Sequence, residues 1–152
     1  MALVAAALVS SPTLFLGFTL DDYILWDSLE NPNSTISPFD LVMFVPGDEA
    51  GYHRLVDNGP YPWWTLPDLK MAFCRPLAMI QIAIDHRLFP RWALPHHIHC
   101  LLWYLALVAS CALVLRSALP GSLAILALLL YAIDDAHALS VSWIANLNQV
   151  EA

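Results

Sequence analysis

Three long runs of uncharged, apolar residues constrain this chain more than any other feature of its sequence. The first covers residues 3–20, the second residues 98–115 and the third residues 119–133. The hydrocarbon core of a bilayer is about 30 Å thick, and a helix that rises about 1.5 Å per residue crosses it in about 20 residues. We therefore predict an all-α membrane protein with about three transmembrane helices.

The composition agrees with a membrane protein and excludes several other classes. Of the 152 residues, 59% are hydrophobic and 12% are charged, whereas soluble domains contain about 25% charged residues. Six lysine and arginine residues against thirteen acidic residues give a net charge of −7, which leaves no basic surface for a phosphate backbone. We expect a lipid bilayer as the surroundings and no nucleic-acid partner.

The first apolar run has a second interpretation, which is a cleaved signal peptide. Residues 2–9 contain no lysine or arginine, and no Ala-x-Ala cleavage site precedes Asp21. A retained helix, kinked at Pro12, is therefore preferred, and cleavage of residues 1–20 stays open.

The number of crossings determines on which side of the membrane each polar segment lies. If the first helix ends at Asp21, the second must enter from the same side after a long external loop at residues 21–97, and the third returns there. The segments expected on that face are Asp21-Asp22, His96-His97 and Asp134-Asp135-Ala136-His137. Arg116, in the short turn between the second and third runs, marks the opposite side as cytoplasmic. The loop would then face outward from the plasma (inner) membrane.

The long external loop is rich in aromatic residues, which predicts a structured loop. Tyr61-Pro62-Trp63-Trp64 suits the headgroup level of a bilayer, where amphipathic rings gather. Thr65-Leu66-Pro67-Asp68 has the pattern of a capping box and predicts the start of a helix. Apolar residues at 77, 80, 84 and 88 mark one stripe of a further helix, which we expect to lie in the membrane interface.

Residues 138–152 begin another apolar segment that is too short to cross a bilayer. We therefore expect residues 1–152 to be the N-terminal part of a longer multi-span membrane domain, with an incomplete tail at its end.

Two pairs of carboxylates follow apolar runs. Asp21 and Asp22 are either a polar stop signal, or a general base or metal ligand at the membrane surface. Asp134 and Asp135 repeat the pattern, and carboxylate oxygens are the ligands that Mg²⁺ or Mn²⁺ prefers. Asp21 and Asp22 are thus candidate catalytic residues, and Asp134 and Asp135 are a candidate metal site.

Basic groups of the same face are candidates for binding a phosphate. Arg75 would hold a phosphate through two hydrogen bonds, or alternatively would extend toward lipid headgroups. The segment Pro95-His96-His97-Ile98-His99-Cys100 lacks the ligand spacing of a structural zinc site. A metal- or haem-binding protein that uses these histidines and His137 is therefore the weaker alternative.

Several short motifs together resemble a known family. In chain order they are Phe18-Thr19-Leu20-Asp21-Asp22-Tyr23, Arg75-Pro76-Leu77, Asp85 to Phe89, Pro95-His96-His97 and Ser142-Trp143-Ile144-Ala145. This order resembles the N-terminal part of the GT-C superfamily of membrane glycosyltransferases. The most similar group is protein O-mannosyltransferase-like, and its members often carry tetratricopeptide repeats after the membrane region. Cys100, Tyr104 and Asp134-Asp135 depart from the pattern of the group.

The resemblance implies transfer of a sugar from a polyprenyl-phosphate donor to an acceptor hydroxyl, with inversion. Asp21 and Asp22 match the acidic pair of the family and would act as the base or as a ligand of Mg²⁺ or Mn²⁺. Arg75, His97 and His137 match elements that would bind the substrate or its phosphate. The remaining transmembrane helices of a longer chain would complete the enzyme, and this segment alone is expected to be inactive. The alternative is a small non-catalytic membrane protein, either a remnant or a partner that docks by its helices.

Overall fold

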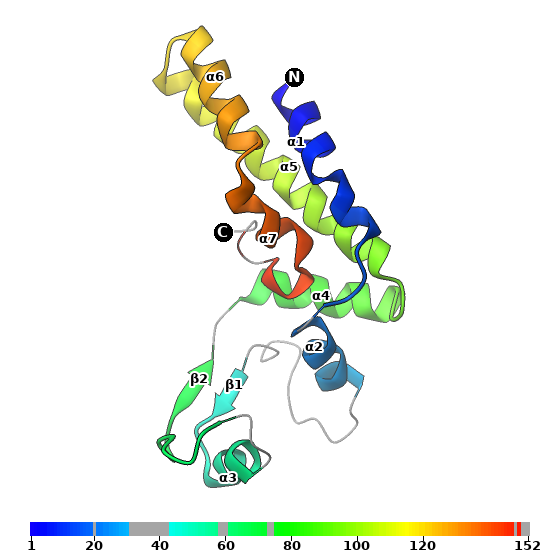
Figure 1. Cartoon of the computed structure of the whole chain (residues 1–152), viewed down its shortest axis with the longest axis vertical. Helices are drawn as coiled ribbons and strands as arrows, with labels where there is room; N and C mark the ends of the chain where they lie inside the picture. Colours follow the sequence, from blue (N-terminus) through cyan, green and yellow to red (C-terminus); the bar gives the residue numbers. More distant parts are fainter. Residues whose placement is uncertain (20, 31–42, 58–60, 73–74, 148, 150–152) are drawn as a thin grey trace.

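The computed structural model describes residues 1–19, 21–30, 43–57, 61–72, 75–147 and 149. The described chain is an elongated bundle of helices with a small lobe at one end (Figure 1). The bundle contains α1 (Ala2–Ser10) with a 3-10 turn at Ser11–Phe15, α5 (Ala93–Ala118) and α6 (Gly121–Ala132). Toward the lobe lie α2 (Asp21–Glu30), α4 (Pro76–Leu88), a 3-10 turn at Asp135–His137, α7 (Ala138–Ser142) and a 3-10 turn at Ile144–Asn146.

Helix α5 is the long axis of the bundle. It begins at Ala93 and has Pro95 in its first turn. A proline is tolerated there, because the backbone N–H groups of the first turn have no acceptor within the helix. It ends at Ala118, because Leu119 is extended before Pro120. Large apolar side chains along it are exposed, among them Leu113 at 72% of its surface. Such a surface suits hydrocarbon better than water.

Among the described residues, α5 is the one helix that is long and apolar enough by itself to cross a membrane. Helix α6 and the segment Asp135–Ser142 form a second candidate, with a bend of 45° between them. The helical part of the first run, Ala2–Phe15, is shorter than a span. The chain is thus mostly helical, as predicted, but the expected three spans are not confirmed.

The boundaries of the predicted spans need correction. The first run is not one helix over residues 3–20, because the helical part ends at Phe15 and Leu16 is extended. Helix α5 begins five residues before the predicted position 98, so residues 93–97 belong to it and not to the external loop. These residues include His96 and His97, which are both buried. The third helix begins at Gly121 rather than at residue 119 and ends at Ala132.

The helix that was predicted from the stripe at residues 77, 80, 84 and 88 is α4. It lies across the end of α5 that starts at Ala93 (Figure 1). The four side chains of the stripe are 41–63% exposed, while Ala78, Met79, Ile82 and Asp85 are buried against the rest of the protein. An apolar stripe that remains exposed is typical of a helix that lies in a membrane interface.

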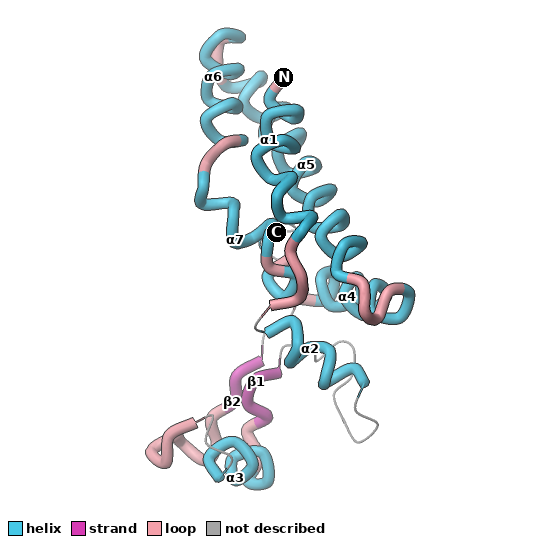
Figure 2. Tube along the Cα trace, turned by 45° about the vertical axis from the view of Figure 1, so that its right-hand side comes forward, coloured by secondary structure: helices cyan, strands magenta, loops and turns pink. Residues whose placement is uncertain are grey.

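The small lobe contains β1 (Met43–Pro46), α3 (Glu49–Asp57) and β2 (Lys70–Ala72), and it lies apart from α1, α5 and α6 (Figure 2). The two strands are antiparallel, with Pro46 opposite Lys70. The predicted helix start at residues 65–68 is wrong. The Thr65 hydroxyl donates back to the carbonyl oxygen of Pro62 at 2.7 Å, so it forms a turn instead of capping a helix.

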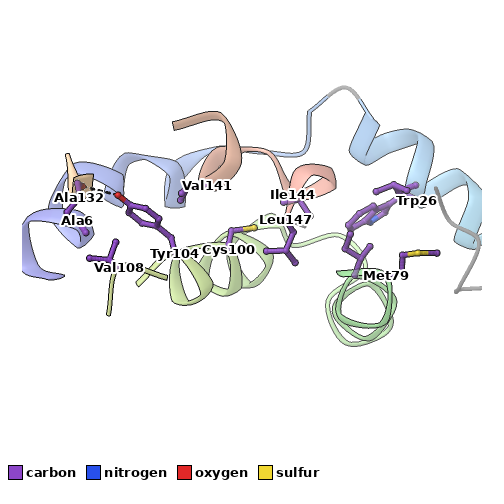
Figure 3. Packing of buried hydrophobic residues seen from close by; sticks show 12 residues of the cluster. Ala6, Trp26, Met79, Cys100, Tyr104, Val108, Ala132, Val141, Ile144 and Leu147 are labelled. Atoms are coloured by element: carbon purple, nitrogen blue, oxygen red, sulfur yellow. Dashed lines mark hydrogen bonds between the residues drawn. The ribbon is translucent and has the colours of Figure 1, made fainter. Parts of the chain in front are cut away.

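The core runs along α5 as a line of buried side chains (Figure 3). Tyr104 lies at its centre and is 1% exposed, and its hydroxyl donates to the carbonyl oxygen of Ala132 at 2.9 Å. This bond satisfies a carbonyl at the end of α6 that has no helical partner. Of the cysteines, Cys100 is buried and Cys111 is half-buried, and Cys74 lies outside the described residues.

Candidate active site

The Asp22 carboxylate connects the two ends of the described chain. Its Oδ2 accepts hydrogen bonds from the backbone N–H of Thr19 at 2.8 Å and from the Thr19 hydroxyl at 3.3 Å. Its Oδ1 accepts from the backbone N–H of Ala145, also at 2.8 Å. Asp22 is 0% exposed. Both carboxylate oxygens are thus used inside the protein.

The bonds between Thr19 and Asp22 form the start of α2. The backbone N–H of Asp22 donates to the carbonyl oxygen of Thr19 at 2.9 Å, while the Asp22 side chain returns to the Thr19 N–H. The return bond from the Asp22 side chain to the Thr19 N–H is one half of a capping box. The Thr19 hydroxyl donates to the same carboxylate instead of accepting the Asp22 N–H. Burial raises the pKa of the Asp22 carboxyl above its ordinary value, and the three hydrogen bonds and the nearby His97 oppose that increase.

Asp21 differs from its neighbour in its exposure. It is the first residue of α2 and is half-buried, so its side chain remains accessible. The backbone N–H groups of a helix start are unsatisfied and favour a negative charge. Of the two predicted catalytic carboxylates, Asp21 is therefore the one that a substrate can reach.

His97 lies close to Asp22. It is 0% exposed, and its Nε2 lies 3.4 Å from the carbonyl oxygen of Gly17, to which an Nε2–H would donate. Asp22 and His97 interact electrostatically. A fully buried ring leaves no surface for a phosphate, so in this structure His97 supports the Asp22 segment.

Arg75 directly precedes α4 and is half-buried. Its carbonyl oxygen accepts the backbone N–H of Met79 at 3.0 Å, in the first turn of the helix. Arg75 therefore stands at the start of the helix that crosses the end of α5.

Asp134, Asp135 and His137 do not join Asp22 and His97. They lie at the bend that follows α6, where a cavity of about 160 Å³ is also lined by Ser10, Thr13 and Tyr104. The His137 ring packs on the Tyr104 and Tyr131 rings, with centroids 5.2 and 4.6 Å apart. Tyr104 is in the middle of α5, so this polar group lies partway along the bundle rather than at the end that holds Asp22.

The described residues do not fit the expected metal site. Within them, no group of three or more His, Cys, Asp or Glu side chains could hold a metal ion. Asp134 and Asp135 are exposed, and the Asp134 Oδ1 accepts the backbone N–H of Ala136 at 2.9 Å. The Asp134 carboxylate therefore starts the 3-10 turn at Asp135–His137.

Two polar contacts that we did not predict join α4 to α5. The Asp85 Oδ2 lies 2.7 Å from the His99 Nδ1, and the Trp103 indole N–H donates to the Gln81 Oε1 at 2.6 Å. Gln81 and Asp85 are four residues apart in α4, and His99 and Trp103 are four residues apart in α5. Residues with this spacing are neighbours on one helix face. That spacing was a readable signal, but nothing in the sequence indicates that the two helices cross there.

The part of the site contributed by the C-terminal segment was also missed. Ala145 acts through its backbone N–H, which the residue type cannot reveal. The Thr19-x-x-Asp22 capping pattern, in contrast, is visible in the sequence.

Comparison with protein families, curated proteins and solved structures gives no match for this chain.

Proposed function

We propose that the chain is the acceptor-side portion of a membrane glycosyltransferase that moves a sugar from a polyprenyl-phosphate donor to an acceptor hydroxyl. The observation that carries the proposal is the accessible Asp21 carboxylate, located next to a fully buried Asp22 at the end of the bundle where α4 crosses α5. The motif resemblance supplies the reaction class, and the site supplies a carboxylate suited to it.

In the proposed reaction Asp21 removes the proton of the acceptor hydroxyl. The oxygen attacks the anomeric carbon of the donor sugar, and the bond to the lipid phosphate breaks with inversion. The lipid phosphate leaves with its negative charge, which Arg75 would stabilise through paired hydrogen bonds. His97 is buried and His137 lies at the bend after α6, so neither is given a direct part in this step.

A lipid bilayer is the environment that suits this function. The exposed apolar side chains of α5 and the exposed stripe of α4 support a helix that crosses the membrane and one that lies at its surface. We place the Asp21 end on the outer side of the plasma (inner) membrane, because Arg116 is at the opposite end of α5. Further transmembrane helices would cover the exposed faces of α5 and α6.

A transfer assay tests the proposal. Membranes that contain the protein as its cell produces it are supplied with radiolabelled sugar on polyprenyl phosphate, and label on the acceptor is measured. We expect Asp21→Asn to lower the rate by about 10²–10⁴-fold, the usual contribution of a general base. Asp68→Asn, which removes an exposed carboxylate in the small lobe, is the matched control and should leave the rate unchanged.

Two results would overturn the proposal. The first is no transfer by the wild-type protein from any polyprenyl-phosphate sugar. The second is full activity of Asp21→Asn, which would favour the non-catalytic membrane protein that docks by its helices.

A further inference from the structure

The two adjacent aspartates have opposite environments, and this difference separates their roles. Asp22 is 0% exposed and accepts three hydrogen bonds, whereas Asp21 is half-buried. No substrate atom can reach Asp22 without breaking bonds that hold it in the fold. Asp22 is therefore unsuited to be a second base.

The bonds of Asp22 fix the peptide that carries Asp21. Asp21 directly precedes Asp22, whose carboxylate accepts both the N–H and the hydroxyl of Thr19, so the bonds that hold Asp22 also restrain the backbone of Asp21. A reacting group must be held within a fraction of an ångström, because a displacement of about 1 Å costs about 10²-fold in rate. The capping pattern supplies this restraint directly beside Asp21.

The Asp22 Oδ1 extends the restraint to a segment far away in the chain. It accepts the N–H of Ala145, in the 3-10 turn Ile144–Asn146. This turn packs against α2 and α5. Ile144 and Leu147 on either side of Ala145 are each 1% exposed, so the turn is anchored in the core (Figure 3).

We propose that Asp22 is a positioning residue for Asp21, and that the segment 144–147 is a working part of the same site because it holds Asp22 through Ala145. This inference rests on the proposed function. It differs from an acidic pair in which both carboxylates take part in proton transfer or bind a metal. If Asp22 had either of those roles, its negative charge would be essential, whereas a positioning role requires only its hydrogen bonds.

The experiment compares Asp22→Asn, Asp22→Ala and Asp21→Asn in the full chain. Asparagine keeps one carbonyl oxygen, which can accept the Ala145 N–H but then turns its NH2 group toward the Thr19 N–H, while alanine keeps no acceptor. Amide hydrogen exchange of a peptide that covers residues 143–147 is measured in detergent, because it reports the Ala145 bond without any activity. Transfer rates and their pH dependence are measured in parallel. Thr19→Ala serves as the mildest variant, because it removes only the hydrogen bond from the Thr19 hydroxyl to Asp22.

We expect exchange at Ala145 to be at least about tenfold faster in Asp22→Ala, since a bond to a buried carboxylate is lost. Exchange should stay near the wild-type rate in Asp22→Asn and Asp21→Asn. Transfer should fall by about 10²-fold in Asp22→Ala. Asp22→Asn should recover part of that loss, because it keeps the Ala145 bond, with an unchanged pH profile.

Unchanged exchange in Asp22→Ala would overturn the inference. An Asp22→Asn variant that is as inactive as Asp22→Ala, with intact exchange protection, would also overturn it, because the charge itself would then be required. If the wild-type protein transfers no sugar, the proposed function fails, and the positioning role fails with it even where the exchange result still shows the Asp22–Ala145 bond.

Discussion

Asp85 and His99 join α4 to α5. The Asp85 Oδ2 lies 2.7 Å from the His99 Nδ1, and the Asp85 side chain is only 4% exposed. One turn earlier in α4 and one turn later in α5, the Trp103 indole N–H donates to the Gln81 Oε1. These two contacts hold α4 across the end of α5, and α2, which carries the candidate catalytic carboxylate, is drawn below α4 (Figure 1).

We expect a double-mutant cycle with Asp85→Ala and His99→Ala to give a coupling free energy of about 1–3 kcal/mol. A hydrogen bond between a buried carboxylate and an imidazole is in the strong class, and each single variant leaves a partner unpaired. Unfolding by denaturant in detergent measures the four free energies. The His53–Asp57 pair is the matched control, because its atoms are 3.5 Å apart and its side chains are 60% and 69% exposed. Its coupling should be below about 0.5 kcal/mol, and equal coupling in both pairs would contradict the prediction.

Tyr104→Phe should destabilise the protein by about 1–3 kcal/mol. The change removes the one hydroxyl that donates to the Ala132 carbonyl oxygen and leaves that buried acceptor unsatisfied. Thermal unfolding followed by circular dichroism measures the effect. Tyr23, which is 60% exposed, provides the matched Tyr→Phe control with little change expected. A similar loss of stability in both variants would contradict the assigned role of the bond.

Asp22 should make the free energy of unfolding depend on pH. Burial raises its pKa in the folded state, so folding favours the protonated form. This contribution is fully present below the unfolded pKa of about 3.9 and is lost as pH rises through the higher folded value. The difference in stability between the wild-type protein and Asp22→Asn should therefore decrease with rising pH from about pH 4 upward, as measured by denaturant unfolding at a series of pH values.

Because other groups titrate equally in both proteins, the comparison with Asp22→Asn isolates this one carboxyl. A difference that grows with pH over the same range would mean that the hydrogen bonds outweigh burial and that the carboxylate is ionised in the folded state.

Leu102→Arg distinguishes a membrane-spanning α5 from an exposed helix in water. Leu102 lies in α5 and is 56% exposed. A central arginine costs about 2.5–3.5 kcal/mol on insertion into a bilayer, whereas an arginine at an exposed site in water is tolerated. We expect Leu102→Arg to move a large share of the protein out of the membrane fraction. Trp63→Arg, at a 78% exposed position of the small lobe, is the control and should not change the fractionation.

Helices α4, α5 and α6 were predictable from the sequence, whereas the ends of the helices were not, nor were α2 and α3 within the expected loop. The uncharged run at residues 98–115 and the stripe at residues 77–88 fall within α5 and α4. The first run, however, turns out of its helix after Phe15, although residues 16–20 are as apolar as those before them. Apolar composition indicates burial or lipid contact, but it does not determine where the backbone leaves the helix.

The composition of the site was predictable only in part. The sequence singled out Asp22 and His97, which lie close together, but the three spans from which a common face was expected are not confirmed. Asp134 and His137 do not join them, because the chain continues beyond α6 through a bend and a further short helix before it reaches Asp22 at Ala145. That contact depends on a backbone N–H, so tertiary packing alone establishes it.

Chemical rescue of the transfer reaction tests the central claim most directly, since it asks whether Asp21 acts as the base. Asp21→Ala and Asp22→Ala are assayed for sugar transfer with and without added formate, a small carboxylate that can replace a missing base. The account predicts that formate restores transfer in Asp21→Ala and has no effect in Asp22→Ala, whose defect is one of position. Rescue of Asp22→Ala without rescue of Asp21→Ala would contradict it.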